Sequence, residues 1–470
     1  MLASKLLTCA LLAGALAPGA RLLAQCPAPP PPAAPPDKAA PADSVPTAER
    51  LEELEQRIRI LERKLELKEE DEAARAKVGP TFAVANDGVT FVAPEGAFQL
   101  RLKGYVQSDG RLYEGVAHAG TSTFLLRRVR PIFEATAFRR YSVRIMPDFG
   151  QGQVVLYDAY LDAAFLPQLG LRFGKFKPPV GLERLQSATN LMFVERALPT
   201  SLVPNRDLGV MLQGAFAGGA VGYALGGFNG VPDGAMADVD TENNKELAGR
   251  IFAQPFLSLQ SDWLHGLGFG VAGSRGSVTG SLTSPALPSY STPGQVAFFK
   301  YRNNGSTTGT TVAAGDHARL SPQGWYYNGP LSVLGEYVIS RQGVALNGAA
   351  RTLDNRAWQV AAAWALTGEA ATPKGLRLHK PASPGSRSLG AVELTARIHD
   401  LSVDDAAFPV YADSTSAARS ARAWAVGANW YPNPNVKLTA DYEHTLFTGG
   451  ARSGDRAPER AIMSRIQFSF

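Results

Sequence analysis

The sequence predicts an all-β fold, a 16-stranded antiparallel transmembrane β-barrel preceded by a short N-terminal coiled-coil helix. Three patterns favour this fold: strands of alternating apolar and polar residues, tryptophans at both ends of apolar strand faces, and short turns alternating with long loops. In residues 461–470, for example, Ile and Phe occupy one face of a strand and mostly polar residues the other. Such a strand suits a sheet between lipid and water. A soluble β-sandwich gives the same local pattern, so the rest of the chain has to decide.

Composition excludes a helical membrane protein. The 470 residues are 45% hydrophobic and include 47 Gly and 33 Pro, and the mean hydropathy is −0.09. Beyond residue 24, no apolar run reaches the roughly 18 to 20 residues that a membrane-spanning helix needs.

The N-terminus is typical of an exported protein. Residues 1–24 contain a lysine, a run of small apolar residues and a small-residue cleavage site, and are predicted to be a signal peptide. Cys26 follows in a sequence similar to a lipoprotein cleavage box, except for Gln25; lipidation and a stray cysteine both stay open. Because no cysteine follows Cys26, internal disulfides and cysteine-based metal sites are excluded.

Two segments precede the predicted barrel. Residues 25–46 are rich in proline and are predicted to form an extended linker. Residues 47–78 place Leu or Ile at spacings of three and four between charged residues, which is typical of a heptad seam. So short a seam is marginal alone, so we expect a periplasmic coiled-coil helix that associates with copies of itself. A solvated single helix is the alternative.

Residues 79–470 are predicted to form the outer-membrane β-barrel. Short alternating runs are separated by Gly, Pro, Asn, Asp and Ser throughout this region. Trp358 and Trp364 bracket one apolar strand face, and Trp424 and Trp430 bracket another. Such pairs match the aromatic girdles where a barrel crosses the two membrane interfaces.

Connection lengths give the strand count, because outer-membrane barrels pair short turns at one end with long loops at the other. Long connections are predicted at 109–122, 178–207, 229–245, 274–320, 342–355, 402–420 and 446–460. The run 296–302 can be counted as a seventeenth strand, but assigning it to the 274–320 loop restores the alternation and gives 16. Connections 255–265 and 368–389 are longer than the turns expected there.

A barrel of about 16 strands encloses an aqueous channel, so the charges on its inner wall matter. Residues 79–470 contain 36 Lys and Arg against 30 Asp and Glu. In residues 124–134, alternation directs Leu125 and Val129 towards lipid and Arg128, Arg130 and Glu134 towards water. Arg127 breaks this pattern and is predicted to lie at an interface or a β-bulge.

The same reasoning extends the basic wall to the next strands. Arg144 and Asp148 are predicted to face the lumen, as is Arg172, and Lys175 and Lys177 follow at the end of that strand. Each of these charges taken alone is also compatible with an ordinary solvated wall residue.

The 178–207 connection mixes apolar residues with paired charges, which an exposed loop rarely needs, so we expect it to fold into the lumen. Its candidate cations are Arg184, Arg196 and Arg206, and its candidate counter-charges are Glu183, Glu195 and Asp207. At a constriction, Arg and Lys attract anions while nearby carboxylates limit the dwell time. Guanidinium groups suit phosphate oxygens in particular.

Several passages resemble the phosphate-selective porin O and P family. They are residues 127–134, 144–149, 158–162, 174–187, 193–199, 204–207 and 335–337, and the resemblance covers about residues 90–470. It implies a trimeric 16-stranded outer-membrane channel with a basic lumen narrowed by its third loop. It also makes Arg128, Arg130, Arg144, Lys175, Lys177 and Arg184 candidate anion contacts.

The predicted function is therefore passive, anion-favouring diffusion of phosphate or similar small acidic solutes across the outer membrane of a Gram-negative bacterium. The expected partners are small anions, outer-membrane lipid, two further copies of the chain and, through a periplasmic N-terminal region, the cell wall. No cofactor, metal, nucleic acid or catalytic residue is expected. Among the histidines, only His399, on an inner face with Glu393, has surroundings of interest for catalysis. General diffusion without phosphate selectivity and a structural or adhesive barrel are the alternatives.

Overall fold

The computed structural model describes residues 47–115, 120–240, 243–258, 263–383 and 388–470. The predicted signal peptide, the proline-rich linker and both cysteines lie outside the described residues. The chain divides into two units, Met1–Asp71 and Glu72–Phe470.

The N-terminal unit contains most of α1, which spans Thr47–Val78. Its apolar seam is uncovered in the single chain, because Leu51, Leu54, Ile58, Leu61 and Leu65 are each between 53% and 64% exposed. Around the seam, i,i+4 ion pairs join side chains of opposite charge, for example Glu53 and Arg57 at 3.0 Å. None of the helices in the described part of the chain is both long and apolar enough to cross a membrane.

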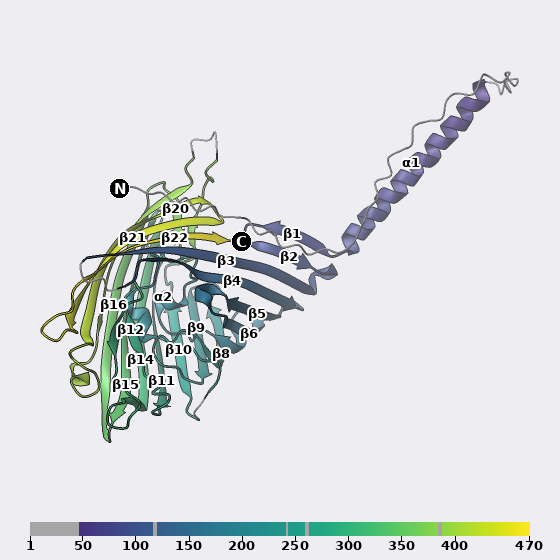
Figure 1. The fold of residues 1–470 in the computed structure, drawn as a ribbon. Helices are drawn as coiled ribbons and strands as arrows, with labels where there is room; N and C mark the ends of the chain where they lie inside the picture. Colours follow the sequence, from purple (N-terminus) through teal and green to yellow (C-terminus); the bar gives the residue numbers. More distant parts are fainter. Residues whose placement is uncertain (1–46, 116–119, 241–242, 259–262, 384–387) are drawn as a thin grey trace, which may run out of the picture. The chain divides into compact units, whose positions relative to one another are not determined.

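The second unit is a closed antiparallel barrel of 16 strands, as the sequence predicts (Figure 1). Each barrel strand pairs with the next along the chain, and β22 pairs with β3 from Arg460 opposite Glu114 to Ser469 opposite Tyr105, which closes the sheet. The barrel strands are β3 Phe98–Glu114, β4 Thr123–Ala137, β5 Tyr141–Asp148, β6 Val155–Leu166, β7 Leu169–Phe176, β8 Asp207–Phe216, β9 Val221–Phe228, β10 Glu246–Ala253, β11 Leu267–Thr279, β14 Val312–Asn328, β15 Leu331–Leu346, β16 Ala349–Ala365, β19 Ala391–Ser402, β20 Ala418–Asn433, β21 Val436–Gly449 and β22 Glu459–Ser469.

In the described part of the chain, six further strands lie outside the barrel ring. β1 Thr81–Ala85 and β2 Gly88–Val92 form a hairpin whose β2 extends the sheet along the first residues of β3. β12 Ser289–Ser291 and β13 Ala297–Lys300 pair within the loop between β11 and β14, so the assignment of residues 296–302 to a loop is confirmed. The last pair, β17 Ala370–Thr372 and β18 Gly375–Arg377, lies in the connection from β16 to β19.

Short helices occur only as single turns in the described connections. They are η1 Pro94–Gly96, η2 Gly150–Gly152, α2 Leu182–Leu185, η3 Leu198–Leu202, η4 Ala217–Gly219 and η5 Asp405–Ala407. We call the barrel end that carries η4 and the β4–β5 turn the turn end, and the opposite end the loop end.

The prediction of one long loop is wrong. The sequence predicts a long connection at 342–355, but β15 runs to Leu346 and β16 begins at Ala349. Asn347 and Gly348 form the whole connection, with φ of 48° and 81°. Asn and Gly accept positive φ at low cost, and a two-residue turn of this kind follows the right-handed twist of the strands.

A β-bulge in β4 corrects the predicted wall facing of Leu125 and explains Arg127. Gln107 lies opposite Arg128 and Ser108 lies opposite Leu126, so Arg127 is the extra residue on β4. The bulge shifts the alternation by one residue. Towards the loop end it is therefore Phe124, 88% exposed, and not Leu125 that faces outwards.

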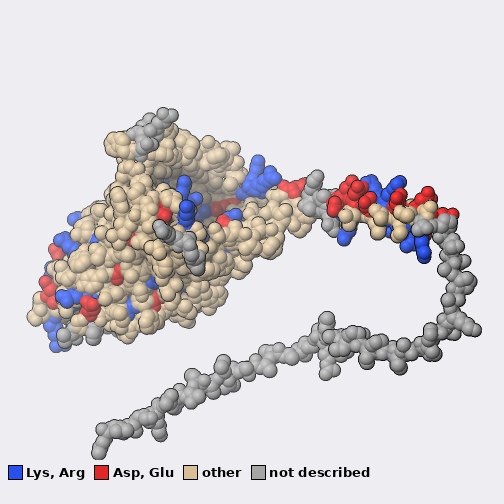
Figure 2. Space-filling model, turned by 90° about the horizontal axis from the view of Figure 1, so that it is seen from above, with Lys and Arg blue, Asp and Glu red and all other residues tan. Residues whose placement is uncertain are grey.

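The outer wall is apolar where lipid is expected. Exposed side chains on this face include Phe173, Ile251, Trp364, Trp424 and Trp430. Figure 2 shows that the side wall in view consists almost entirely of uncharged residues, whereas Lys, Arg, Asp and Glu gather at the loop end on the left. This distribution is the one expected of a barrel whose middle faces hydrocarbon.

Candidate functional site

The connection from β7 to β8, residues 177–206, lies inside the barrel and divides its interior into two sides. We call it the inner loop; α2 and η3 belong to it. One side of the inner loop is bonded to the strands β3, β4, β15, β16, β19, β21 and β22, and the other faces open cavities. The two sides use charge differently.

Glu195 is the centre of the bonded side. Its carboxylate receives guanidinium groups from four arginines, at 2.6 Å from Arg127, 3.1 Å from Arg111 and 3.2 Å from both Arg128 and Arg465. Burial opposes ionisation of Glu195, but the guanidinium groups of Arg127 and Arg128 outweigh it and hold the pKa of Glu195 well below its ordinary value. The loop is thereby tied to three strands through one carboxylate.

Backbone groups of the inner loop complete this attachment. The carboxylate of Glu336 on β15 accepts the N–H of Leu182 at 2.6 Å, and that of Asp441 on β21 accepts the N–H of Val194 at 2.7 Å. In the other direction, the ammonium of Lys437 donates to the carbonyl of Leu191 at 2.6 Å. Buried backbone groups need such partners, because leaving one unpaired costs on the order of 1–3 kcal/mol.

Two cavities lie on the open side of the inner loop. The turn-side cavity has a volume of about 740 Å³ and reaches the turn end at Pro167. The loop-side cavity, of about 480 Å³, reaches residues 287–295 of the long loop between β11 and β14. Arg130, Arg196 and Arg206 line both cavities, so arginines border the place where the two cavities adjoin, which we call the passage.

Positive charge dominates both cavities. Around the turn-side cavity, seven cationic side chains face a single carboxylate, that of Asp158. The cations are Arg130, Arg144, Arg172, Lys177, Arg196, Arg206 and Arg250. The loop-side cavity adds Arg127, Arg128 and Arg184, with Glu195 and Asp233 as its carboxylates. Such a field attracts anions and repels cations.

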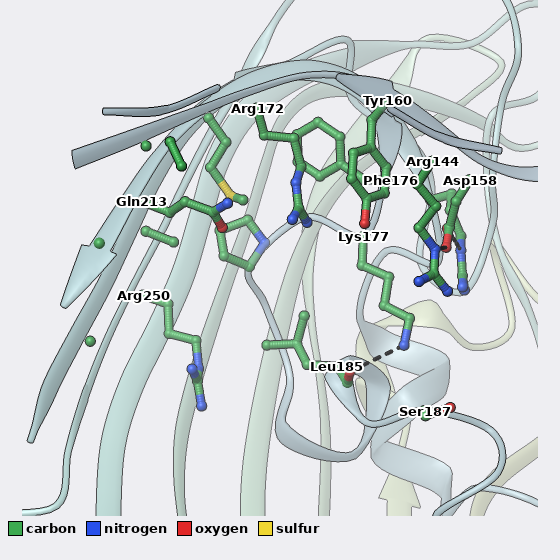
Figure 3. A pocket seen from close by; sticks show the side chains of 18 of the residues that line it. Arg144, Asp158, Tyr160, Arg172, Phe176, Lys177, Leu185, Ser187, Gln213 and Arg250 are labelled. Carbon is green, nitrogen blue, oxygen red and sulfur yellow. Dashed lines mark hydrogen bonds and ion pairs between the residues drawn. The ribbon is translucent and has the colours of Figure 1, made fainter. Parts of the chain in front are cut away.

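Lys177 and Arg196 are held by carbonyl groups of the inner loop instead of by carboxylates. The ammonium of Lys177 donates to the carbonyls of Leu185 at 3.2 Å and Gln186 at 2.8 Å, a contact drawn in Figure 3 for Leu185. The guanidinium of Arg196 donates to the same Gln186 carbonyl at 2.8 Å. Among the described residues, no carboxylate oxygen lies within 4.0 Å of either cation, so their charges are not neutralised.

Arg184 belongs to the same group. Its guanidinium donates to the side-chain oxygen of Asn205 at 3.2 Å and to the carbonyl of Thr200, and no carboxylate within the described ranges forms an ion pair with it. Burial, and then the neighbouring charge of Arg206, lower the pKa of Arg184 to about 10. A bound anion would remove this repulsion, which is the electrostatic condition of an anion site.

Apart from Arg250, which donates to Gln323, the remaining cavity arginines have carboxylate partners. Arg130 pairs with Asp148 at 2.8 Å, Arg206 with Asp158 at 3.0 Å and Arg172 with Asp162 at 2.7 Å. These pairs keep guanidinium groups in fixed orientations beside the passage.

The structure places eight of the nine predicted cations in the lining of a cavity: Arg128, Arg130, Arg144, Arg172, Lys177, Arg184, Arg196 and Arg206. The ninth, Lys175, lines neither cavity; it is buried and pairs with Asp238. Of the predicted counter-charges, Glu195 alone lines a cavity. Glu134 pairs with Lys103 and Arg144, Asp148 with Arg130, Glu183 accepts the N–H of Ala197, and Asp207 accepts those of Leu208 and Gly230.

Sequence reasoning missed Arg250 and Asp158. Arg250 lies on β10 between Gly249 and Ile251 and shares the inner face with one other charge, Glu246, so no run of basic residues marked it. Asp158 lies in the segment 158–162, which the family resemblance covers, but no sequence pattern distinguished Asp158 from Asp162.

His399 has a structural role in these contacts. Its Nδ1 accepts the N–H of Leu198 at 3.3 Å, and its Nε2 lies 3.7 Å from Glu443. Within the described part of the chain, no three His, Cys, Asp or Glu side chains form a group that would hold a metal ion.

Comparison with known proteins identifies the family. The family model of the phosphate-selective porin O and P matches residues 98–470, which begin at the first residue of β3. The chain belongs to this family. It is accordingly a porin, a channel of the outer membrane.

Individual relatives agree with this assignment. Porin O of Pseudomonas aeruginosa is 24% identical over 413 residues, which cover 82% of this chain and 91% of that protein. Among solved structures, the outer membrane channel DcaP of Acinetobacter baumannii is 10% identical with a TM-score of 0.52, and covers 80% of this porin and 98% of its own chain. OmpT of Vibrio cholerae is 11% identical, also with a TM-score of 0.52, over 81% and 99%. These structures share the barrel fold.

Proposed function

We propose that this porin mediates passive, anion-favouring diffusion of phosphate or similar small acidic solutes, without covalent chemistry. The observation that carries the proposal is the group Lys177, Arg184 and Arg196, whose charges are held at the passage without carboxylate partners. The inner loop narrows the lumen and positions these cations, while the paired Arg130 and Arg206 border the same passage. Anions therefore gain favourable contacts on entry.

Phosphate fits this site by its geometry. A guanidinium offers several N–H donors in one plane, and two or three such groups can surround a tetrahedral oxyanion. The carboxylates of Glu195 and Asp158 keep part of the positive charge neutralised, which favours release of the solute.

Bilayer recordings test the proposal. We expect the purified protein to show a reversal potential in a chloride gradient that indicates anion preference, and added phosphate to reduce the chloride current. The double variant Arg184→Gln, Arg196→Gln should lower the anion-to-cation permeability ratio several-fold, whereas Arg341→Gln, which breaks an exposed pair with Asp354, should not.

The outcomes separate the alternatives. Unchanged reversal potentials in the double variant would overturn the assignment of these cations. Anion preference without any effect of phosphate would indicate a general diffusion porin. An absence of ion current from correctly folded protein would support a structural or adhesive barrel.

We also propose that the porin is a homotrimer. The strands β5, β7, β9 and β10 have eight residues each, fewer than the roughly 9–11 that a tilted strand needs to cross a membrane. Neighbouring copies that cover this short wall would shield it from lipid. The uncovered apolar seam of α1 favours a coiled coil between the same copies, on the periplasmic side.

Deletion of residues 27–77 tests the second part of this assembly. The barrel should still conduct, while the oligomer should dissociate at a lower temperature on native gels. An oligomer of unchanged stability would exclude a role of the coil in assembly. Contact of this region with the cell wall stays a prediction from the sequence.

A further inference from the structure

The turn-side cavity contains an apolar patch that a small inorganic anion does not use. On the inner faces of β5 to β9 and on α2, the cavity is lined by Met146, Tyr160, Phe176, Leu185, Met211 and Ala224. The loop-side cavity differs, because the surface that its lining exposes is mainly polar, with side chains such as Thr200, Ser201 and Asn205. A solute that enters by charge therefore meets the larger apolar surface after it has passed the arginines.

Arg250 lies at the edge of this patch. Its Nε donates to the side-chain oxygen of Gln323 at 3.2 Å, and its guanidinium carbon lies 4.5 Å from the ring centre of Phe252. Across the strand pairs, its neighbours are Ala224 and Ala272, whose small side chains leave the guanidinium accessible from the lumen. No carboxylate among the described residues forms an ion pair with it.

Figure 3 shows the relation of these groups. Arg250 on the left and Lys177 on the right both point downwards, and Leu185 lies between them in this view. Arg172 extends from the strand above the cavity. Its guanidinium carbon lies 4.1 Å from the ring centre of Tyr160, and its Nε and Nη2 donate to the carboxylate of Asp162. Because Asp162 neutralises Arg172, this arginine acts as part of the wall. Among the described residues that line the cavity, the cations without a carboxylate partner are then Lys177, Arg196 and Arg250.

We propose that the turn-side cavity is an exit subsite for organic anions that carry a compact apolar body, such as aryl phosphates or aryl carboxylates. Arg250 binds the anionic group, and the surface formed by Leu185 and Tyr160 packs against the apolar body. The inference rests on the proposed function, since it presupposes that anions enter. It adds that the channel selects by charge first and by apolar contact second.

The subsite predicts a difference between two probes in the same bilayer experiment. Phenyl phosphate added from the turn side should reduce the chloride current at a concentration about tenfold below that required for inorganic phosphate, because burial of the ring adds apolar contact. Arg250→Gln should raise the blocking concentration of phenyl phosphate several-fold. Leu185→Gln keeps the carbonyl that holds Lys177, and should reduce the ratio between the two probes.

Two further variants serve as controls in this experiment. Arg250→Lys preserves the charge and should retain most of the phenyl phosphate effect, so that a general disturbance of β10 can be recognised. Arg341→Gln, at an exposed pair on the β15–β16 hairpin, is the control and should behave as the unmodified protein.

The results distinguish the two proposals. Equal block by both probes in the unmodified protein, or full block by phenyl phosphate in both Arg250→Gln and Leu185→Gln, would overturn the exit subsite. If the chloride gradient shows no anion preference at all, the proposed function itself fails, whatever the probes do.

Discussion

The two sides of the inner loop use the same residue type for opposite purposes. On the bonded side, Arg111, Arg128 and Arg465 lie within 3.2 Å of the Glu195 carboxylate and are almost completely buried. On the open side, Arg184 and Arg196 donate to carbonyl or amide oxygens and keep their charge. The number of arginines therefore does not predict the electrostatic field in a channel. The positions of the carboxylates that pair with them do.

Replacement of Glu195 should have the largest effect on folding and conductance. Glu195→Gln would leave four guanidinium groups around a neutral side chain, and breaking a buried pair in this way typically costs on the order of 3–5 kcal/mol. We expect much less heat-modifiable barrel on gels and, in the protein that folds, a larger conductance because the inner loop is released. Asp354→Asn, in an exposed pair, is the matched control. Normal folding and conductance of Glu195→Gln would contradict the role of this carboxylate.

Alkaline pH should act on the open side through Lys177. Burial, followed by repulsion from Arg206 and Arg196, lowers the pKa of Lys177 well below its ordinary value, although Asp158 acts in the opposite direction. Lys177 therefore loses its proton at a lower pH than an exposed lysine, and the anion-to-cation permeability ratio should fall as pH rises from neutral. Lys177→Arg should remove the fall, because arginine stays protonated. A pH profile that is identical in both proteins would exclude Lys177 as its source.

A paired arginine of the turn-side cavity can be converted into an unpaired one by removing its carboxylate partner. Asp158→Asn removes the one carboxylate that lines the turn-side cavity among the described residues and frees Arg206. Anion preference should therefore rise, on the order of twofold if one charge acts through water-filled space. Reversal potentials measure this change. Asp162→Asn, which frees Arg172 instead, is a neighbouring control, and a decrease in anion preference in either variant would be inconsistent with this view.

Salt should produce the smallest effect. At about 1 M ionic strength the Debye length is only about 3 Å, so the cations of the open side are screened while the buried pairs are not. We expect anion preference to decline between dilute and concentrated salt, with no change in the temperature at which the barrel unfolds on gels. A parallel loss of both properties would indicate that the two sides are not independent.

Much of the architecture could be predicted from local patterns, and the exceptions have local causes. Alternation in residues 461–470 and the connection lengths predicted 16 strands, because lipid on one face and water on the other impose a period of two. The extra residue at Arg127 interrupted that period, which reversed the assignment of Leu125. The loop expected at 342–355 is a two-residue turn, because polar residues also continue a strand beyond the membrane.

The candidate site was predicted in its residues but not in its division of roles. Alternation showed that Arg128 and Arg130 face inwards, yet it could not show that Glu195, some 65 residues further along the chain, would neutralise Arg128. Lys175 seemed equivalent to Lys177 in sequence, but the two face different surroundings, and Lys175 pairs with Asp238. Arg250 escaped notice because an isolated arginine on a strand carries no periodic signal.

By itself, the sequence determined that this chain forms a barrel, which face of most strands meets lipid, and that its interior is basic. These properties follow from the order of neighbouring residues, since a strand's period of two acts over a few positions. Only the tertiary structure decided which cations are neutralised, because ion pairs form between residues that are distant in the chain and depend on contacts of a few ångströms. The folding of residues 177–206 against one wall determines which of these cations meet a carboxylate.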